Sequence, residues 1–438
     1  MFDPLLSREI KSGQNHNAYW LNTTDILSFP TIENSAQFDV VIVGGGYTGL
    51  SCAIHLAKQG VKNIAVLESN HIGFGCSGRN AGFVLPGSGR LGYGELVKRF
   101  GKQGALSLHQ DYLAGIDLLQ ELSSAAGSDI ERTESGYLKL AHSAKWFDKL
   151  KTSADYLQKE FDYDVEIIEQ SNFCQHYVDH KKVFGAIRYS NGFGLNPLKL
   201  VNGYANYAKS LGVAIFQNAS VTDINYGNDP AVTCNGHKIS ADKIVMATNG
   251  YTPQKMPSPL QNKILPVLTS VIVTEPLTKE QLANSNFRSQ QVMMDTRELK
   301  YYYRLLPDKR VLFGGRSAIT GKQSTHPKYK MRLLTELQQS FPALASVNIS
   351  CDWTGWISVA LDQMPHIYHD NNVYYSTGYC GGGVSFTSIA GKKLADLVVG
   401  KSIETPLATA LPNFPFPAFR RLGQTAFYQW GRLKDSFT

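Results

Sequence analysis

Hydrophobic and polar positions change period repeatedly along this chain, and the changes predict strands alternating with helices. The clearest case is residues 38–43, a nearly continuous β-branched run that is typical of a parallel strand buried on both faces. A glycine-rich turn follows, and then a predicted helix over 50–59 that stops at Gly60. A second buried strand over 63–68 completes a β-α-β unit.

Later segments predict a second kind of sheet. Between residues 264 and 315 apolar and polar residues alternate, as in antiparallel strands with one covered face. Residues 91–170 have a mainly helical pattern, interrupted by a strand at 136–140. Further strands are predicted at 183–189, 213–216, 243–247 and 373–376, and further helices at 196–211, 328–340 and 388–399. Because the two patterns are interspersed, we expect an α/β fold with two domains woven through each other.

The composition narrows the class of protein. The chain has 438 residues, of which 43% are hydrophobic and 18% are charged. These figures exclude a disordered chain and a coiled coil. A single core rarely grows beyond about 250–300 residues, so more than one domain is expected. The net charge is +7, but no run of five basic residues occurs, so nucleic acid is not an expected partner.

The cysteines and the hydrophobic stretches indicate the compartment. Six cysteines occur without a CxxC pair, so no metal site is predicted. The first residues include an acid and no apolar stretch, unlike a secretory signal. No window approaches the about 18 apolar residues that a transmembrane helix needs. We therefore expect a protein of the reducing cytoplasm.

The turn after the first strand has the spacing of a dinucleotide-binding loop. Gly44, Gly46 and Gly49 spell G-x-G-x-x-G between a buried strand and a helix, and Glu68 ends the next strand. Gly46 has no side chain to keep a pyrophosphate away, and the helix start offers N–H groups to its charge. Glu68 can accept both ribose hydroxyls, and its charge would repel a 2′-phosphate. The ligand predicted here is FAD or NAD, and not NADP.

Two further glycine-rich stretches favour the flavin. Residues 73–82 follow Glu68 closely and can lie against a second part of the ligand, which a nicotinamide enzyme does not need. Residues 377–384 precede a predicted helix. The positive end of that helix can face the N1–O2 edge of a flavin and favour its anionic reduced form. FAD is therefore the predicted cofactor.

Several of these segments resemble a known family. Residues 39–50, Glu68 and the Gly-Arg-Asn loop at 73–80 are similar to the D-amino-acid oxidase/glycine oxidase superfamily of FAD enzymes, and most similar to its gamma-glutamylputrescine oxidase branch. Further similar segments are 302–304, 312–315, 353–355, 364–365, 374–375 and the Pro-Phe-Pro tail at 411–417. The resemblance covers about residues 18–430.

The resemblance implies a fold and a reaction. It implies a Rossmann-like FAD-binding domain interleaved with an α+β substrate domain on an antiparallel sheet. We place an N-terminal arm at 1–37, the FAD-binding domain at 38–90, 183–262 and 350–438, and the substrate domain at 91–182 and 263–349. The family reaction is the oxidation of a C–N bond to an imine, by hydride transfer to flavin N5. O2 usually reoxidises the flavin, and water hydrolyses the imine to an aldehyde or keto acid.

Site residues follow from the motifs and the resemblance. The predicted FAD contacts are Gly44, Gly46, Tyr47, Thr48, Gly49, Glu68, Ser77, Gly78, Arg79, Asn80, Ala81, Gly82, Val221, Gly250, Gly381, Gly382, Gly383 and Val384. The predicted substrate contacts are Tyr301, Tyr303, Arg304, Trp356 and Cys380. No catalytic acid or base is assigned. A non-covalent flavin is expected, because Cys76 and Cys380 do not lie where sarcosine-oxidase relatives attach theirs.

Departures from the family bear on the substrate. Amino-acid oxidases of this superfamily carry an arginine for the substrate carboxylate shortly after the Thr-Gly of one strand, and this chain has Trp356 or Ile357 there. Losing that bidentate partner argues for an amine rather than an α-amino acid. On the strand at 301–304, Tyr301 and Tyr303 share one face, and Tyr302 and Arg304 share the other. We expect Tyr303 in the pocket, and Arg304 on a distal carboxylate if it turns inward.

The sequence leaves two other interpretations of the function open. The chain could be an amino-acid or opine dehydrogenase that passes electrons to a quinone, or a non-catalytic flavin-binding subunit. The favoured partners are a gamma-glutamylputrescine-like amine and O2 or another electron acceptor. The identity of the amine and the oligomeric state are not predicted.

Overall fold

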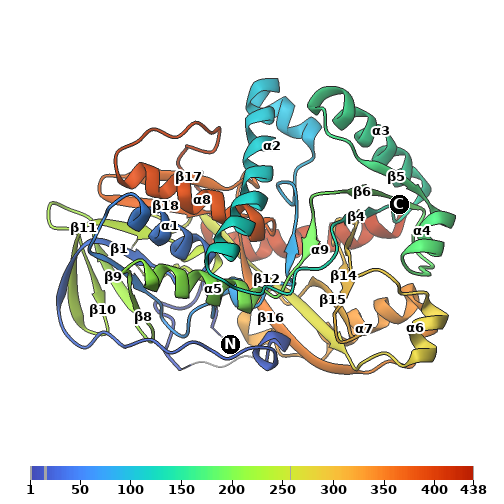
Figure 1. Cartoon of the computed structure of the whole chain (residues 1–438), viewed down its shortest axis with the longest axis horizontal. Coiled ribbons are helices and arrows are strands. Elements are labelled where there is room, and N and C mark those ends of the chain that lie inside the picture. Colours follow the sequence, from blue (N-terminus) through green and yellow to red (C-terminus); the bar gives the residue numbers. More distant parts are fainter. Residues whose placement is uncertain (1, 14–16, 257, 438) are drawn as a thin grey trace.

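Two sheets organise the chain in this computed structural model, which describes residues 2–13, 17–256 and 258–437. The first has the strand order β17-β18-β11-β1-β2-β8, with β10 attached to β11 and β9 attached to β10 (Figure 1). Its strands are β1 (Ala36–Val43), β2 (Ile64–Leu67), β8 (Ala214–Phe216), β9 (Val221–Asn225), β10 (Ala231–Cys234), β11 (His237–Met246), β17 (His366–Asp370) and β18 (Val373–Thr377). β1 pairs in parallel with β2 and β11, as its continuous apolar run predicts.

Both faces of β1 are covered, which explains that run. Val40 and Ile42 face a core shared with the helices α1 (Tyr47–Lys58), α5 (Pro197–Ser210) and α8 (Gly383–Val398). Val41 and Val43 face a second core that includes residues of β9 and β10. The α/β prediction is confirmed, and two helices begin earlier than expected: α1 at Tyr47 and α8 at Gly383, each directly at its glycine-rich loop.

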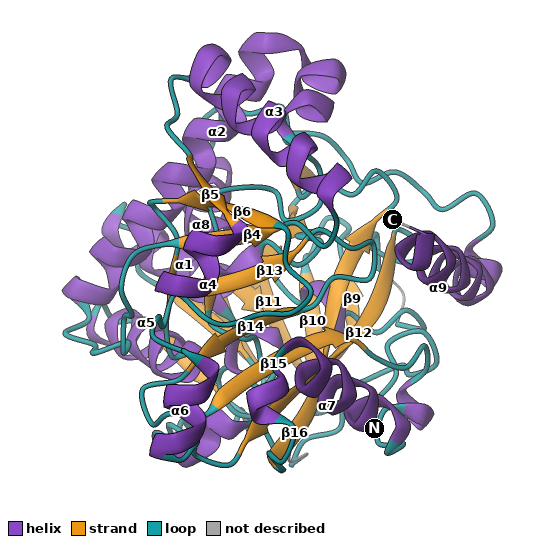
Figure 2. Cartoon of the chain, turned by 90° about the vertical axis from the view of Figure 1, so that its right-hand side faces the viewer, coloured by secondary structure: helices purple, strands orange, loops and turns teal. Residues whose placement is uncertain are grey.

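The second sheet has the order β16-β12-β15-β14-β13-β4-β6-β5 and is antiparallel except between β13 and β4. Its strands are β4 (Tyr137–Leu140), β5 (Glu166–Glu169), β6 (Gly185–Tyr189), β12 (Ile264–Thr274), β13 (Val292–Asp295), β14 (Tyr302–Leu305), β15 (Val311–Arg316) and β16 (Ile349–Ala360). The helix α7 (Lys328–Ser340) lies across β12 and β15 on one face (Figure 2). The opposite face is left for the site.

The remaining elements connect and cover the sheets. They are β3 (Phe83–Val84), β7 (Phe193–Gly194), α2 (Tyr93–Ala125), α3 (Ala144–Phe161), α4 (Gln170–His176), α6 (Lys279–Ser285), α9 (Arg420–Phe437) and short 3-10 turns at 19–22, 76–78, 249–251, 321–323, 342–344 and 417–419. β3 and β7 pair with each other. Among the described residues, no helix is both long enough and apolar enough to span a membrane.

Two of the expected domain boundaries differ from the division between the sheets. β6 was expected in the FAD-binding domain, but it pairs with β4 and β5 of the second sheet. β16 was expected there as well, but it pairs with β12 along most of its length, from Ile264↔Ala360 to Thr274↔Ile349. Hydrophobic periodicity identifies a strand without naming its partner, so the sequence could not show that these two strands pair with the second sheet, and the domain boundaries at 183 and 350 stay a proposal.

The first described residues lie over the first sheet and its connections. The Phe2 ring stacks on Tyr251, with centroids 6.3 Å apart. Ser220 donates a hydrogen bond from its hydroxyl to the carbonyl of Ile10 over 2.8 Å. The N-terminal segment therefore contributes to the surroundings of the β1–α1 turn.

Gly49 tests the close packing between α1 and the turn that precedes it. A Cβ at this position would lie 2.1 Å from the carbonyl oxygen of Gly44. We expect Gly49→Ala to cost about 1–3 kcal/mol of stability, because the backbone must shift to accommodate the methyl group. The measurement is Tm by differential scanning calorimetry. Gly423→Ala is the matched control, since its Cβ meets nothing within 4 Å on α9. Equal Tm values for the two variants would contradict this packing.

Candidate cofactor and substrate site

Two adjoining cavities lie between the sheets. We name the one beside β1 and β2 the nucleotide cavity, and the one against the second sheet the sheet cavity. The nucleotide cavity is bordered by Gly44, Glu68 and Val221, among others. The sheet cavity is bordered by Thr269, Tyr302 and others. Both are lined by Cys76, Asn80, Ile357, Cys380, Gly381 and Val384, so the second begins where the first ends.

The β1–α1 turn forms one wall of the nucleotide cavity. Gly44 has φ +114°, which glycine adopts readily, and a Cβ there would meet the carbonyl of Ala247 at 2.9 Å. Gly46 lies against the Ser77 hydroxyl, which accepts the Tyr47 N–H over 3.0 Å. Tyr47 and Thr48, in the first turn of α1, also line the cavity. A pyrophosphate bound here would meet the positive end of a helix.

Glu68 is positioned as the sequence predicts. Its side chain is 8% exposed and lines the nucleotide cavity at the end of β2. One carboxylate oxygen accepts the Gly45 N–H over 2.9 Å, and the other accepts the Asn70 N–H over 3.1 Å. Burial raises the pKa of this carboxyl, and these backbone donors oppose the rise. The oxygen that accepts Asn70 also accepts the Ser69 hydroxyl over 3.1 Å, so the oxygen facing Gly45 is the one that keeps acceptor capacity for a ribose hydroxyl.

Asn80 holds the loop that separates the two cavities. Its amide nitrogen donates to the carbonyls of Cys76 and Ser77 over 3.1 Å each, and its oxygen accepts the Gly82 N–H over 2.8 Å. The indole of Trp20 donates to the Asn80 carbonyl over 2.9 Å. The loop is therefore fixed by its own side chain and can present its backbone to a ligand.

Arg79 contributes a buried cation to the sheet cavity. The side chain is 4% exposed, and its Nε donates to the Phe74 carbonyl over 2.6 Å. The guanidinium lies 4.2 Å from the centroid of the Phe74 ring. Its Nη2 has no hydrogen-bond partner among the described residues. A buried donor without a partner is costly, and an oxygen of a bound ligand would satisfy it.

The loop before α8 reaches both cavities. Cys380 and Gly381 adopt positive φ values of 51° and 96°, and they are followed by the start of α8 at Gly383. Gly383 and Val384 line the nucleotide cavity. Burial raises the pKa of Cys380 to about 12 and that of Cys76 to about 11, so both thiols are protonated at neutral pH.

Five predicted cofactor residues do not line either cavity: Gly49, Gly78, Gly82, Gly250 and Gly382. Their role is to let backbone segments approach closely. A Cβ would lie 2.0 Å from the Leu195 carbonyl at Gly82, 2.9 Å from the Ser88 carbonyl at Gly382 and 2.7 Å from the Ile357 carbonyl carbon at Gly250. Gly78 donates its N–H to the Gly73 carbonyl over 2.8 Å. These glycines shape the loops that border the site.

The aromatic strand β14 presents the opposite face from the one expected. Tyr303 lies in the core beneath the second sheet, parallel to Phe313 with ring centroids 5.4 Å apart. Tyr301 packs against that core too. Tyr302 lines the sheet cavity instead, and its ring fills the space left by Gly314, whose Cβ would meet it at 2.2 Å. The assignment of Tyr301 and Tyr303 to the pocket is therefore corrected.

Arg304 and Trp356 are also placed away from the cavities. Arg304 shares the face of Tyr302 but lies farther along, where its Nη2 donates to the Leu195 carbonyl over 2.6 Å and its guanidinium lies 5.4 Å from the Trp20 ring. Trp356 is fully buried on the far face of β16, and its indole donates to the Phe2 carbonyl over 3.0 Å. Ile357, its neighbour, lines both cavities. Cys380 is the predicted substrate residue that borders the sheet cavity.

Sequence reasoning missed Lys300, Arg316 and Met294, which line the sheet cavity. Lys300 belongs to the turn between β13 and β14, where a polar segment gives no periodic signal. Arg316 ends β15, and strand alternation places it on the face of Gly314. The sequence therefore held one signal for Arg316. Once one cavity residue of β15 is known, strand alternation predicts that Arg316 faces the same cavity.

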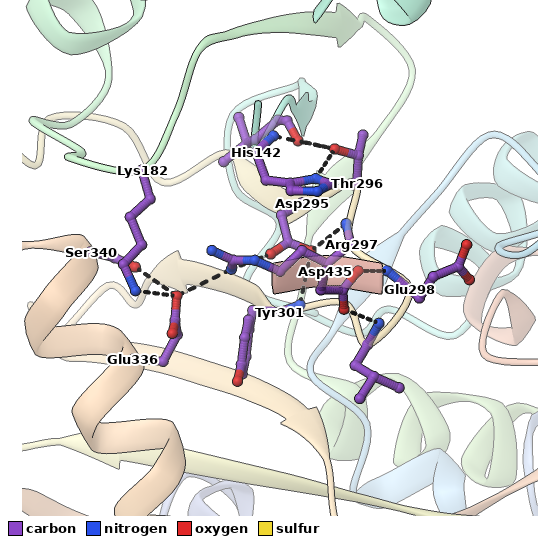
Figure 3. Close-up of polar contacts among 12 residues, drawn as sticks. His142, Lys182, Asp295, Thr296, Arg297, Glu298, Tyr301, Glu336, Ser340 and Asp435 are labelled. Carbon is purple, nitrogen blue, oxygen red and sulfur yellow. Dashed lines mark hydrogen bonds and ion pairs between the residues drawn. The ribbon is translucent and has the colours of Figure 1, made fainter. Parts of the chain in front are cut away.

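A polar network fixes the turn that carries Lys300 (Figure 3). Asp295 accepts the Tyr301 N–H over 3.0 Å and pairs with Arg297 over 2.7 Å, and Arg297 also contacts Glu336 of α7 over 3.1 Å. Burial raises the pKa of Asp295 to about 6, against the opposing charge of Arg297. Asp435 of α9 accepts the Glu298 N–H over 2.8 Å. Two helices therefore hold the ends of this turn.

Comparisons with known proteins match almost the whole chain. The family model DAO, described as FAD dependent oxidoreductase, matches residues 39–397. A gamma-glutamylputrescine oxidoreductase of Escherichia coli is 31% identical over 395 residues, covering 90% of this chain and 91% of the relative. A probable oxidoreductase, OrdL, of Haemophilus influenzae is 31% identical over 389 residues, covering 87% and 88% of the two chains. The glycine oxidase structure from Geobacillus kaustophilus superposes with TM-score 0.70 at 20% identity, covering 85% and 98%.

Glu68 offers a test of the adenosine end of the site. We expect Glu68→Ala to weaken FAD binding by roughly 1.5–3 kcal/mol, because charge-assisted hydrogen bonds to the ribose are lost. Glu68→Gln, which keeps one acceptor oxygen, should lose less. The dissociation constant is measured by titrating apoprotein into FAD and following flavin fluorescence. The exposed Glu33→Ala variant is the control. An unchanged constant for Glu68→Ala would show that the ribose lies elsewhere.

Tyr302 and Tyr303 test which face of β14 meets the substrate. Tyr302→Ala should raise the KM of the substrate about tenfold, because a wall of the sheet cavity is removed. Tyr303→Phe should leave the kinetics unchanged, since the buried Tyr303 hydroxyl has no hydrogen-bond partner among the described residues. Steady-state kinetics of both variants decide the matter. A raised KM in Tyr303→Phe alone would restore the original assignment.

Proposed function

Because this chain belongs to the DAO family of FAD-dependent oxidoreductases, we propose that it oxidises a C–N bond of an amine to an imine. When bound, FAD accepts the hydride that leaves the carbon beside the nitrogen. Water then hydrolyses the imine to an aldehyde and ammonia, or to an aldehyde and an amine where the substrate nitrogen is secondary. O2 is the proposed electron acceptor, and a gamma-glutamylputrescine-like amine is the proposed substrate, after the relative of that name.

One observation carries the choice of an amine over an α-amino acid. The wall that β16 contributes to the sheet cavity consists of Gly355 and Ile357, so this strand offers no guanidinium at the place where amino-acid oxidases of the family carry their arginine; Arg79 and Arg316 reach the cavity from a loop and from β15. Phe83, Val271 and Tyr302 extend this apolar wall. Such walls accept the alkyl stem of an amine.

The chain's own residues would hold the cofactor in an extended pose. Glu68 would bind the ribose, and the start of α1 would face the pyrophosphate. The backbone at Gly381 and the start of α8 would face the flavin ring. The attachment is proposed to be non-covalent, because the thiols of Cys76 and Cys380 are protonated and therefore poor nucleophiles.

Positioning and desolvation are the proposed contributions of the protein to the rate. A hydride leaves readily only from a neutral amine, and walls of low polarity favour the neutral form over the ammonium. Holding the reacting carbon in one orientation adds the effect of proximity. All six cysteines are free thiols, which supports a proposed location in the reducing cytoplasm.

Anaerobic reduction of the flavin tests the substrate class. Mixing the holoenzyme with gamma-glutamylputrescine should bleach the flavin faster than glycine, D-alanine or L-proline does, because the cavity is built for an alkyl stem. Hydrogen peroxide formation in air would then support O2 as the acceptor. A higher kcat/KM for D-alanine than for gamma-glutamylputrescine would reject the proposal that the substrate is an amine. Reduction by amines without peroxide would instead identify a dehydrogenase.

A further inference from the structure

We infer that Arg316 and Lys300 form a binding site for a carboxylate that the amine substrate carries at the end remote from the oxidised C–N bond. This inference rests on the proposed function and specifies its substrate class: an amine whose far end bears a free carboxylate. Arg316 ends β15 of the second sheet and Lys300 lies in the turn before β14, and both side chains line the sheet cavity.

The charge of the sheet cavity is the first argument. Three basic side chains border it, namely Arg79, Lys300 and Arg316, and none of its described lining residues is an aspartate or a glutamate. Arg79 belongs to the loop between the two cavities and is held by the Phe74 carbonyl. Arg316 and Lys300 are contributed by the second sheet. An anionic group entering this cavity therefore meets cations without a competing carboxylate on its walls.

The position of Arg316 is the second argument. It is paired with Thr269, two residues beyond the pair of Tyr302 with Gly314, and strand alternation turns Arg316 and Gly314 to the same face. Arg297 and Arg310 each pair with an aspartate, but Arg316 has no carboxylate partner among the described residues. A partly buried guanidinium without an anion is a ready partner for a bidentate carboxylate.

The surroundings of Lys300 are the third argument, because they disfavour the charged form of its side chain. Burial lowers the pKa of Lys300 to about 7, and the charges of Arg90, Lys139 and Arg316 act in the same direction. Asp295 opposes them, but it already accepts the Arg297 side chain and the Tyr301 N–H. Arg90 is paired with Glu298 over 3.3 Å. A carboxylate bound beside Lys300 would supply the negative charge that this side of the cavity lacks.

The route into the cavity places this site at the distal end of the substrate. Lys300, Met294, Leu85 and Gly89 line the sheet cavity and also a larger cleft between α2, α3 and α9. Ile357 and Gly381 line both the sheet cavity and the nucleotide cavity, so the sheet cavity adjoins the nucleotide cavity as well as the cleft. A substrate that reaches the flavin with its amine therefore keeps its far end near Lys300 and Arg316.

Binding of unreactive probes to the holoenzyme tests the site without turnover. The probes are N-butyl-gamma-glutamamide and N-butylsuccinamate, which carry a carboxylate, and N-butylacetamide, which does not. We expect the two carboxylated probes to bind at least about tenfold more tightly than the acetamide in isothermal titration calorimetry. Arg316→Gln and Lys300→Met should each lose about tenfold for the carboxylated probes only. The exposed Arg8→Gln is the control and should bind all three as wild type does.

The pH dependence gives a second readout. The carboxylate favours charged Lys300, so binding raises the pKa of Lys300 and takes up a proton. The affinity of wild type for the carboxylated probes should therefore fall as the pH rises from 6 to 9, and Lys300→Met should remove most of that fall. The acetamide should show no such dependence in either protein.

Three results would overturn the inference: equal affinity for all three probes, unaltered probe binding in both variants, or loss of FAD from Arg316→Gln, which would assign Arg316 to the cofactor. Failure of the proposed function looks different. If no amine reduces the flavin while the carboxylated probes still bind selectively, the oxidation of an amine is rejected and the carboxylate site stands. If amines reduce the flavin and the three probes bind equally, the oxidation of an amine stands and the carboxylate site is rejected.

Discussion

The close packing of α1 against α8 is the contact on which the site depends. The Ser51 hydroxyl donates to the Ser388 carbonyl over 2.7 Å, and a Cβ on Gly391 would lie 2.6 Å from that of Ser51. At the start of the helices, the Thr48 hydroxyl meets the Tyr379 hydroxyl over 2.8 Å. Figure 1 shows the two helices side by side over the first sheet. Because the helices touch through small residues, their glycine-rich starts open onto the same cavity.

The packing of α1 on α8 also bears on the position of the second sheet, which lies opposite the two helix starts. With the two helix starts on one side, a flavin ring needs a wall on the other, and β12 and β16 supply it through Val271, Gly355 and Ile357. β16 is joined to the loop that follows β18 by the bridge from Val359 to Tyr379, the same tyrosine that meets Thr48. The loop 377–383 is therefore held between the two sheets, and its backbone is positioned by both.

The sequence predicted the parts of the site whose signal is local. The spacing of Gly44 and Gly46 with Glu68 singled out residues that border one cavity, because a β-α-β turn is determined within one stretch of chain. Alternation on β14 correctly separated Tyr301 and Tyr303 from Tyr302, but it could not tell which face meets the ligand. Which face of β14 meets the ligand depends on tertiary structure, because α7 and the core beneath it cover one side of the sheet.

Contacts between distant segments could not be predicted from the sequence either, because they also depend on the tertiary fold. Lys300 and Arg316 come from a turn and a strand end with ordinary composition, and they border one cavity only because β13, β14 and β15 are neighbours in the sheet. Trp356 and Ile357 are adjacent in the sequence, yet pairing with Leu268 and Val267 turns them to opposite faces of β16. A strand pattern without partners leaves such choices undecided.

The cations of the sheet cavity act on both ends of the proposed substrate. They attract the distal carboxylate, and the same positive field disfavours an ammonium at the reacting end, so the neutral amine gains relative to its protonated form. One carboxylate does not neutralise Arg79, Lys300 and Arg316 together, so this preference persists once the substrate is bound. A diamine without an acyl tail would bring two ammonium groups into this field and meet repulsion at each. Acylation of one nitrogen with a γ-glutamyl group removes the positive charge of that nitrogen and adds an α-carboxylate together with its α-ammonium. The carboxylate can then bind the cations only at the acylated end, and this fixes which nitrogen faces the flavin.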